Sequence, residues 1–573
     1  MLQIFLAIVY ISLLCWTYGY ATVQLFRNTV KAQEAAWPSF PVVCITGLSS
    51  IAVMAGIASL FIPLGGLALH LVMLTAGVGY WFMYKQTGTD FRHAICGSVK
   101  SYHLLTLLLL GICIVLVLVM GAWVIIHPDT LGYHVQTIRW IEQYRVVPGL
   151  AHLHIRYGYQ GYWYLLCALF GFSFTHTTAL TFINASVACW FLIFVTGKIN
   201  EALAKESNGN RQALLNGLLF LLLLTISLWD FGQLRLSVVS TSPDFVAAVY
   251  VWLVFYLLAG RNDPHEALNL VLVFFLSMIA VTIKLSSIPV VLVCCYVIYR
   301  LIRLAKGRAL AVLTGSALLI TIPFVTRNVL TSGYPVFPSA VGGMVRTEWK
   351  MDSMRTELEK QYIYAYARIG PQAVRGRQPA IAGSLQSWLP VWWTNRSQAE
   401  KASLALLVVT LLGGTVFVKK ILSRSSYRLY VSLGASLAGL AFWFLQAPDP
   451  RFGYGFIFSA TGMLLYRLFE GTAFSFHAGV RLIRYGVLAL TVVVAGYTMY
   501  RMQRFFHIRN LITPEGIAAI AYKKVKAYGN IFYIPYDDCE CSGTPLPCVY
   551  DTGSFRMRGK KLTEGFTGTK PAK

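Results

Sequence analysis

Long apolar runs separated by short basic loops set the pattern of this chain. Windows near the ~20 residues that a helix needs to cross a bilayer recur along most of the sequence. The pattern predicts an all-α polytopic membrane protein with about fourteen membrane helices. We expect these at residues 2–26, 41–62, 65–83, 103–126, 178–198, 211–230, 244–259, 267–283, 285–304, 309–325, 402–418, 427–446, 451–468 and 483–500.

One apolar segment, residues 160–174, decides how the loops are divided between the two faces of the membrane. It is shorter than a spanning helix, so we expect it to re-enter the membrane or to lie along its surface. The basic loops then all face the cytoplasm, as the positive-inside rule requires. Among their residues are Lys85, Lys198, Arg300, Lys419 and Arg467.

This orientation places the long polar segments on the outer face. They are the loops at 127–158 and 326–401 and the tail from about residue 501. We therefore expect a membrane domain over residues 1–500 and a small extracytoplasmic C-terminal domain over 501–573.

The tail carries its own structural signals. Residues 532–535 favour a strand. Outside the cytosol, Cys541 and Cys548 are placed to close a small disulfide loop, which leaves Cys539 without an obvious partner.

Composition supports the membrane assignment and excludes one function class. The chain is 57% hydrophobic and only 12% charged, whereas a soluble domain has roughly 25% charged residues. Its formal net charge of +25 does not indicate nucleic-acid binding, because the Lys and Arg residues are spread through short loops between helices. Membrane lipids or phosphate-bearing substrates are better partners for this charge.

The most informative polar stretch follows the apolar run that ends at Ile126. Charged groups are costly near hydrocarbon, which favours a functional role for this stretch over a purely structural one. Asp129 is a candidate general base, and Asp129, His134 and His154 are also candidate ligands for Mg²⁺ or Mn²⁺, a requirement that the sequence leaves open. Capping of a helix by Asp129 is the structural alternative. The stretch contains Asp129, His134, His152, His154 and Arg156.

Further candidate residues lie at the ends of later apolar runs. Asp244 either caps a helix or orients an acceptor, and Lys284 either reaches the interface or pairs with an anion. Arg327 is expected directly after a helix, where a guanidinium suits phosphate oxygens, and Tyr334 follows in a turn. Arg451 is expected at the outer membrane edge, paired with Asp449 or with a phosphate.

The residues so assembled resemble those of the GT-C superfamily of membrane glycosyltransferases. That resemblance implies a lipid-phosphate-linked sugar donor, Asp129 as the base, and Arg327 and Arg451 as phosphate ligands. The chain departs from the pattern because Asp129 is flanked by Pro128 and Thr130 and not by a second acid. Three or four predicted helices also precede the loop, where one is usual.

More closely, the chain resembles a family of bacterial polytopic membrane proteins without an assigned activity. The shared words are Asp129-x3-Tyr133-His134, Val147-Pro-Gly-Leu-x-x-Leu-His154, Ser242-Pro-Asp244, Ser332-Gly-Tyr-Pro335, Asp449-Pro-Arg-Phe452 and Pro545-Leu-Pro-Cys548.

These resemblances lead to the expectation of a glycosyltransferase in a bacterial inner membrane with its site facing the periplasm. It would move a sugar from a polyprenyl-phosphate or polyprenyl-diphosphate donor to an acceptor that the sequence does not identify. Asp129 and His134 would serve catalysis, and Arg327, Arg451 and Lys284 would bind the donor phosphate. Acceptor-side or supporting roles fall to Asp244, His152, His154, Arg156, Tyr334 and Asp449.

Two other functions remain open at this point. An O-antigen-type polymerase or ligase would depend on the loop 326–401 and not on Asp129. A transporter of lipid-linked substrates would bind its cargo without breaking a bond. No phosphate-binding loop with a Walker A lysine and no glycine-rich dinucleotide turn is present in the sequence.

Overall fold

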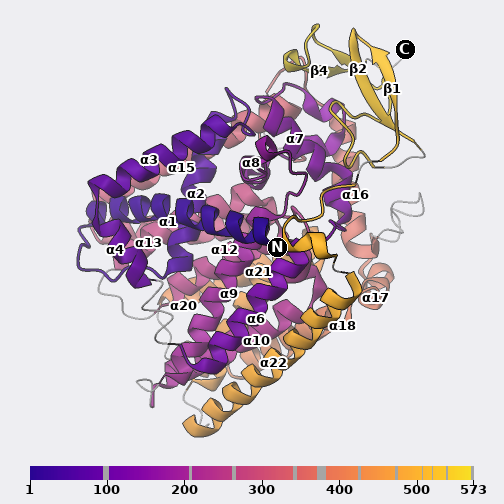
Figure 1. The fold of residues 1–573 in the computed structure, drawn as a ribbon. Helices are drawn as coiled ribbons and strands as arrows, with labels where there is room; N and C mark the ends of the chain where they lie inside the picture. The colour runs from indigo at the N-terminus through magenta and orange to yellow at the C-terminus, as the bar shows by residue number, and fades with distance from the viewer. Residues whose placement is uncertain are drawn as a thin grey trace.

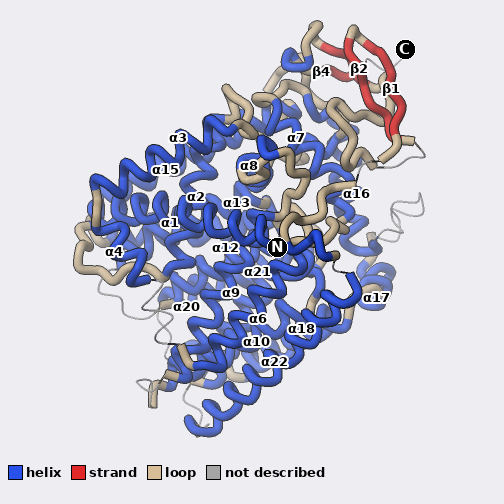
Figure 2. Tube along the Cα trace, viewed as in Figure 1, coloured by secondary structure: helices blue, strands red, loops and turns tan. Residues whose placement is uncertain are grey.

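Helices make up most of the computed structural model of the chain (Figure 1). The structure describes residues 1–94, 102–204, 209–260, 266–339, 343, 345–370, 383–423, 427–470, 475–505, 507–518, 520–536 and 540–569. Strands are confined to one end of the molecule, near α7 (Val135–Gln143) and α16 (Ser353–Ile369) (Figure 2).

Each of the expected membrane segments coincides with helical structure. The long helices are α1 (Leu2–Val30), α2 (Phe40–Ala58), α3 (Leu67–Met83), α6 (Leu104–Gly121), α9 (Phe182–Leu203), α10 (Arg211–Trp229), α12 (Asp244–Ala259), α13 (Glu266–Ile283), α14 (Val291–Arg303), α15 (Gly307–Ser332), α18 (Gln398–Val416), α20 (Tyr427–Gln446), α21 (Pro450–Phe469) and α22 (Phe476–Phe505). Shorter helices are α4 (Gln86–Arg92), α8 (Tyr162–Leu169), α11 (Leu236–Val238), α17 (Leu385–Thr394) and α19 (Val418–Ser423).

Within the described residues, 11 helices are long and apolar enough to cross a membrane, or up to 12 if each bent pair is one span. The bent pair is α3 with α4, at an angle of 97°. The expected count of about fourteen differs because α12 is shorter than these spans and α21 is not among them. The length and apolar composition of these helices identify the chain as an integral membrane protein, as expected.

The segment 160–174 forms the 8-residue helix α8, which is buried along its whole length. At a rise of about 1.5 Å per residue it is about 12 Å long, well short of the ~30 Å hydrocarbon core. It packs against α2 and α7 inside the protein. A helix of this length supports the expectation that the segment does not cross the membrane.

Short helical turns position much of the outer polar region. In the first outer loop they are η2 (Thr130–His134), η3 (Leu150–His152) and η4 (Ile155–Gly158). Others are η5 (Ser173–Thr175), η7 (Phe231–Arg235), η8 (Leu285–Val290), η10 (Ile508–Leu511) and η11 (Leu562–Glu564).

The segment 326–401 differs from the expected loop. Helix α15 continues to Ser332, so the prediction that Arg327 follows the end of a helix is wrong. The apolar run ends near residue 325, but polar residues continue the same helix inside the protein, where Arg327 and Asn328 are buried. The segment also contains helices α16 and α17. Two of its basic residues, Arg375 and Arg377, lie outside the described residues.

The C-terminal domain contains two small antiparallel sheets. Strands β1 (Tyr522–Ala527) and β2 (Asn530–Pro535) form a hairpin in which Ala527 pairs with Asn530. Its two turn residues, Tyr528 and Gly529, both have positive φ, as a tight hairpin turn requires. Strands β3 (Phe555–Met557) and β4 (Phe566–Gly568) form the second sheet. The predicted strand at 532–535 is confirmed as part of β2.

Helices α1 and α2 cross at two glycines. A Cβ placed on Gly19 would lie 1.9 Å from the Val43 carbonyl oxygen, and one on Gly47 would lie 1.8 Å from that of Cys15. These positions admit no side chain, so the two backbones approach closely, as small residues allow in membrane helix packing.

We expect Gly47→Ala to lower the thermal melting midpoint of the purified protein, because the methyl group forces the two helices apart. Overpacking of this kind costs about 1–3 kcal/mol. Gly111→Ala in α6 is the matched control, since a Cβ there meets no atom within 4 Å. Equal melting midpoints for both variants would contradict the close crossing.

Candidate functional site

Six charged residues from four segments gather where α12 and α21 begin and α13 ends. We call them the charge cluster: Asp129, Arg156, Asp244, Lys284, Asp449 and Arg451. The first outer loop supplies two of them, and helix ends supply the rest. The sequence therefore brings distant helix ends together at one charged site.

Local structure fixes each helix end. The Ser242 hydroxyl accepts a hydrogen bond from the Asp244 backbone N–H at 3.3 Å, where α12 begins. The Asp449 carboxylate caps α21 by accepting the Arg451 backbone N–H at 3.0 Å. Lys284 lies in extended backbone between α13 and η8. Hydrogen bonds to the backbone thus explain why Ser242 and Asp449 stand before apolar helices, whereas the Asp244 and Lys284 side chains make no capping hydrogen bond.

Asp244 is the centre of the buried half of the cluster. Its carboxylate forms an ion pair with the Lys284 ammonium and lies 4.0 Å from the Arg451 guanidinium. Arg451 also contacts the Asp449 carboxylate at 3.3 Å. The Lys284 ammonium lies 3.7 Å from the centroid of the Phe452 ring. Each buried charge thus has a partner of opposite sign, which burial requires.

Asp129 forms the more open half of the cluster. Its side chain is 38% exposed, against 11% for Asp244 and 9% for Asp449. The Arg156 guanidinium lies 3.6 Å from it and 3.2 Å from the carboxylate of Glu359, on α16. The Tyr159 hydroxyl donates to Glu359 at 2.5 Å. Asp129 is therefore the carboxylate of this network with the best access to a substrate.

Burial and charge act in opposite directions on the pKa of Arg156. Burial lowers the pKa of the guanidinium. The charges of Glu359, Tyr133 and Tyr159 together raise this pKa by more than burial lowers it, so the net shift is upward. Arg156 therefore stays cationic next to Asp129.

Two buried histidines, His127 and His134, lie beside the charge cluster. The His127 ring stacks on that of His134 at 5.9 Å between centroids, and its Nε2 faces the Arg451 guanidinium at 3.5 Å. The His134 Nδ1 lies 3.0 Å from the Thr241 hydroxyl. Burial lowers the pKa of both rings, which keeps them neutral at neutral pH. The His127 Nδ1 accepts the Thr130 backbone N–H at 3.2 Å, which places the proton of the neutral ring on Nε2.

Other predicted site residues lie outside this cluster. Arg327 is 2% exposed and donates to the Gln160 side chain at 2.5 Å and to the Ser59 carbonyl at 3.5 Å. The His152 Nε2 lies 3.1 Å from the Trp349 carbonyl. The Tyr334 hydroxyl donates to the Met351 carbonyl at 3.1 Å. Each of the three side chains therefore has a hydrogen-bond partner within the protein, away from the charge cluster.

His154 lies between Arg156 and the C-terminal domain. Its ring is 5.7 Å from that of Tyr550, and its Nδ1 accepts the Arg156 backbone N–H at 3.3 Å. Burial, with a smaller effect of the Arg156 charge, lowers the pKa of His154 to about 4. It is neutral over the physiological range.

Sequence reasoning missed the part played by His127 and Glu359. His127 begins the polar stretch that follows Ile126, but the sequence gives it no role. Its stacking on His134 and its contact with Arg451 show that it belongs beside the charge cluster. Glu359 lies in a strongly polar helix whose pattern is that of a solvated surface. No sequence signal separates it from its exposed neighbour Glu357, so only the fold could identify it.

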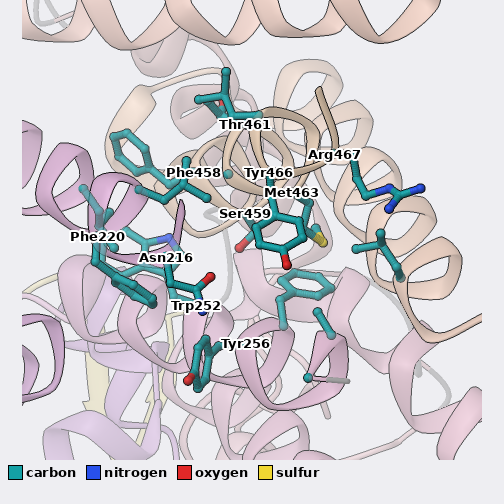
Figure 3. A pocket seen from close by; sticks show the side chains of 18 of the residues that line it. Asn216, Phe220, Trp252, Tyr256, Phe458, Ser459, Thr461, Met463, Tyr466 and Arg467 are labelled. Atoms are coloured by element: carbon teal, nitrogen blue, oxygen red, sulfur yellow. The ribbon is translucent and has the colours of Figure 1, made fainter. Parts of the chain in front are cut away.

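A cavity of about 600 Å³ opens between α10, α12 and α21 (Figure 3). Its walls are mostly aromatic and aliphatic, with Phe220, Trp252 and Phe458 among them, and polar groups such as Asn216 and Ser459 face it. Trp252 lies eight residues after Asp244 and Phe458 seven after Arg451, so the cavity begins about 10–12 Å along both helices from the charge cluster.

Within the described residues, no three His, Cys, Asp or Glu side chains gather in a way that could hold a metal ion. The acidic groups of the cluster are instead paired with basic ones. Their arrangement suits proton transfer at Asp129 and binding of an anion near Lys284 and Arg451.

One comparison with known proteins gives a match. A family model described as a domain of unknown function, DUF8201, matches residues 1–458. This range includes all six residues of the charge cluster and ends before the C-terminal domain. No curated protein and no solved structure matches the chain.

Replacing Asp244 by Asn should strongly destabilise the protein, because Lys284 and Arg451 lose their shared carboxylate. Breaking a buried pair from one side costs about 3–5 kcal/mol. Glu201→Gln is the control, since Glu201 pairs with Lys198 and is half-exposed, and such pairs contribute at most about 1 kcal/mol. Thermal melting in detergent measures the stability of both variants. Equal falls in the melting midpoint would contradict the claim that Asp244 stabilises two buried cations.

Proposed function

This chain belongs to the DUF8201 family, and from the geometry of its own residues we propose that it is a membrane glycosyltransferase. Its donor would be a sugar linked to polyprenyl phosphate or polyprenyl diphosphate. The observation that carries the proposal is the charge cluster, in which the charge of an accessible carboxylate, Asp129, acts on Arg451, and Arg451 shares Asp244 with Lys284.

Asp129 is the group that we assign as general base. It takes the proton of an acceptor hydroxyl while the hydroxyl oxygen attacks the anomeric carbon of the donor sugar. The bond from that carbon to the phosphate oxygen breaks, and the departing phosphate keeps the electron pair. The exposure of Asp129 supports this role, and its contact with Arg156 holds the carboxylate in position.

Arg451 and Lys284 are the groups that we assign to the departing phosphate. Stabilising charge that develops in the transition state is usually the largest contribution to such catalysis. In the free protein both cations contact Asp244. An incoming phosphate would compete with that carboxylate, so Asp244 keeps the cations in place until the donor arrives. Arg327 has no part in this proposal, because its guanidinium already donates hydrogen bonds to Gln160 and to the Ser59 carbonyl.

The cavity between α10, α12 and α21 is the place that we assign to part of the donor's lipid chain. A polyprenyl chain leaving a phosphate near Arg451 would follow α12 and α21 to the apolar walls around Trp252 and Phe458. Buried apolar surface stabilises such a chain by about 25 cal/mol per Å².

We also propose that the site faces the periplasm of a bacterial cell. The basic loops support this orientation through the positive-inside rule. The disulfide between Cys541 and Cys548 supports it too, because such bonds persist in oxidising compartments.

Asp129→Asn should abolish product formation and leave folding intact, because the amide cannot accept the proton. Mass spectrometry of membrane glycolipids and glycoproteins, from cells with and without the protein, identifies the product and measures its loss. Asp551→Asn is the control, since Asp551 is exposed and its side-chain oxygen accepts a local hydrogen bond that Asn also accepts. Wild-type turnover in Asp129→Asn would refute the base. Transfer of an intact lipid carrier without bond cleavage would favour a transporter.

Gly462→Leu should weaken use of the natural long-chain donor, because the new side chain extends from a residue that lines the cavity. A Cβ there meets no atom within 4 Å, so the backbone accepts the change. Gly434→Leu on α20 is the matched control, open in the same way but not among the lining residues. We expect a loss of at least about tenfold in product for Gly462→Leu alone, equivalent to about 1.4 kcal/mol. Equal product from both variants would contradict the assignment.

A further inference from the structure

The C-terminal domain shares a hydrophobic core with the first outer loop. Trp140, Val147 and Leu150 of the loop pack in one cluster with Phe532 and Phe566 of the C-terminal domain. The ring of Phe566 meets that of Trp140 edge-on at 6.1 Å. Since neither side buries these residues alone, the two segments form one packed unit.

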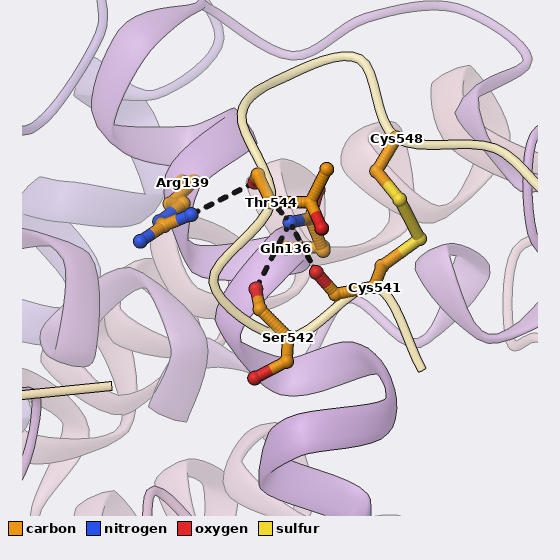
Figure 4. The surroundings of a disulfide bond; sticks show 6 residues. All are labelled: Gln136, Arg139, Cys541, Ser542, Thr544 and Cys548. Carbon is orange, nitrogen blue, oxygen red and sulfur yellow. Dashed lines mark hydrogen bonds between the residues drawn. A yellow bond between two sulfur atoms is a disulfide. The ribbon is translucent and has the colours of Figure 1, made fainter. Parts of the chain in front are cut away.

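The disulfide loop is held onto the loop helix α7 by hydrogen bonds (Figure 4). The Gln136 amide donates to the carbonyls of Ser542 at 3.1 Å and Thr544 at 2.7 Å. The Arg139 guanidinium donates to Thr544 at 2.9 Å. The Ser542 backbone N–H donates to the Leu131 carbonyl at 3.0 Å. The loop closed by the disulfide therefore has a fixed position against the turn that follows Asp129.

This attachment brings Glu540 to the mouth of the candidate site. Glu540 directly precedes Cys541, and its carboxylate lies 3.3 Å from the point where a Cβ of Gly132 would stand. Gly132 is three residues after Asp129 in the same turn. Burial raises the pKa of Glu540, the Asp129 charge raises it further and the Arg156 charge lowers it. Glu540 is thus close enough to interact with both members of that ion pair.

A second residue of the C-terminal domain faces the same region. The Tyr550 ring lies beside His154, and its charge interactions are with Glu540 and Arg156. The segment 540–550 therefore presents a carboxylate and a phenol to the open side of the Asp129–Arg156 pair.

We propose that Glu540, held by the Cys541–Cys548 loop, is a positioning residue of the site that accepts a hydrogen bond from a polyhydroxylated acceptor and orients it toward Asp129. This inference rests on the proposed function. Glu540 forms no covalent bond and receives no proton in the reaction. Its carboxylate fixes the second hydroxyl of an acceptor whose first hydroxyl is deprotonated by Asp129.

The position of Glu540 is tested without any assay of activity. In the full-length protein with Cys539→Ser, a bismaleimide with a short spacer should link the pair Gly132→Cys and Glu540→Cys, seen as a linked peptide by mass spectrometry. The pair Gly132→Cys and Glu201→Cys is the control and should remain unlinked, because Glu201 lies at the end of α9 far from the site. Failure of the first pair to link would overturn the placement, and with it the proposal.

The hold of the disulfide loop on α7 is tested by hydrogen exchange. Cys541→Ser with Cys548→Ser should speed exchange in residues 130–136 in the intact protein, because the hydrogen bonds of the loop loosen. Gln136→Met removes the three hydrogen bonds that the Gln136 amide donates to this loop and leaves the disulfide intact. It should therefore also speed exchange in residues 130–136, even if the double variant folds poorly. Unchanged exchange in Gln136→Met would show that these hydrogen bonds do not hold the disulfide loop against α7.

The role of Glu540 is tested in membrane vesicles that contain the protein and the cell's own lipid-linked glycans. Glu540→Gln should reduce product formation at least tenfold, whereas Glu540→Asp should restore part of it because the charge returns. A purely structural role would be met by Gln, which keeps the size of Glu, whereas its neutral amide is a weaker hydrogen-bond acceptor than the carboxylate. Glu357→Gln, an exposed site on α16, should match the wild type.

The pH profile adds a readout that a structural role would not move. Asp129, Arg156 and Tyr550 face Glu540. Because the pKa of Glu540 is raised, wild-type product formation should fall as the pH decreases through that pKa, and Glu540→Gln should lack this fall. Wild-type turnover in Glu540→Gln would refute the role and leave the proposed function standing. If the wild-type protein and Asp129→Asn form equal product, the proposed function itself fails.

Discussion

The pairing of buried charges at the ends of α12, α13 and α21 is the constraint on which this outer region depends. Lys284 and Arg451 would be very costly so close to the membrane without carboxylates, and Asp244 and Asp449 supply them. The pairs also fix where these three helices meet. A requirement of electrostatics thus sets the packing geometry, and the packing in turn positions Asp129 near two cations.

The same pairing limits what the site can bind. Each cation of the buried half already contacts a carboxylate, and the two neighbouring histidines are neutral, so the resting site has little excess positive charge. Under the proposed function, a donor phosphate would compete with Asp244, and a long lipid chain in the cavity beside Trp252 would supply additional contacts. Binding at the cluster and binding in the cavity would then be two parts of one recognition step.

The sequence predicted the helices well and the site in part. Apolar runs located the membrane segments because burial in lipid imposes them, and the cost of charge near lipid singled out Asp129, Lys284 and Arg451. Arg327 was misplaced because an apolar run marks where lipid contact ends, while α15 continues inside the protein to Ser332. Glu359 and Glu540 carried no signal, since their positions follow from contacts between segments hundreds of residues apart in the chain.

The C-terminal domain changes how the site is bounded. The polar tail looked like an appendage, but Phe532 and Phe566 complete a core with the first outer loop, and the disulfide loop holds the turn after Asp129. The turn is too short to form a core of its own. Contacts with the C-terminal domain hold it in place. The base that we propose, Asp129, would have to be held to within a fraction of an ångström, and the domain that steadies this turn would then belong to the site as much as the helices that carry the charges.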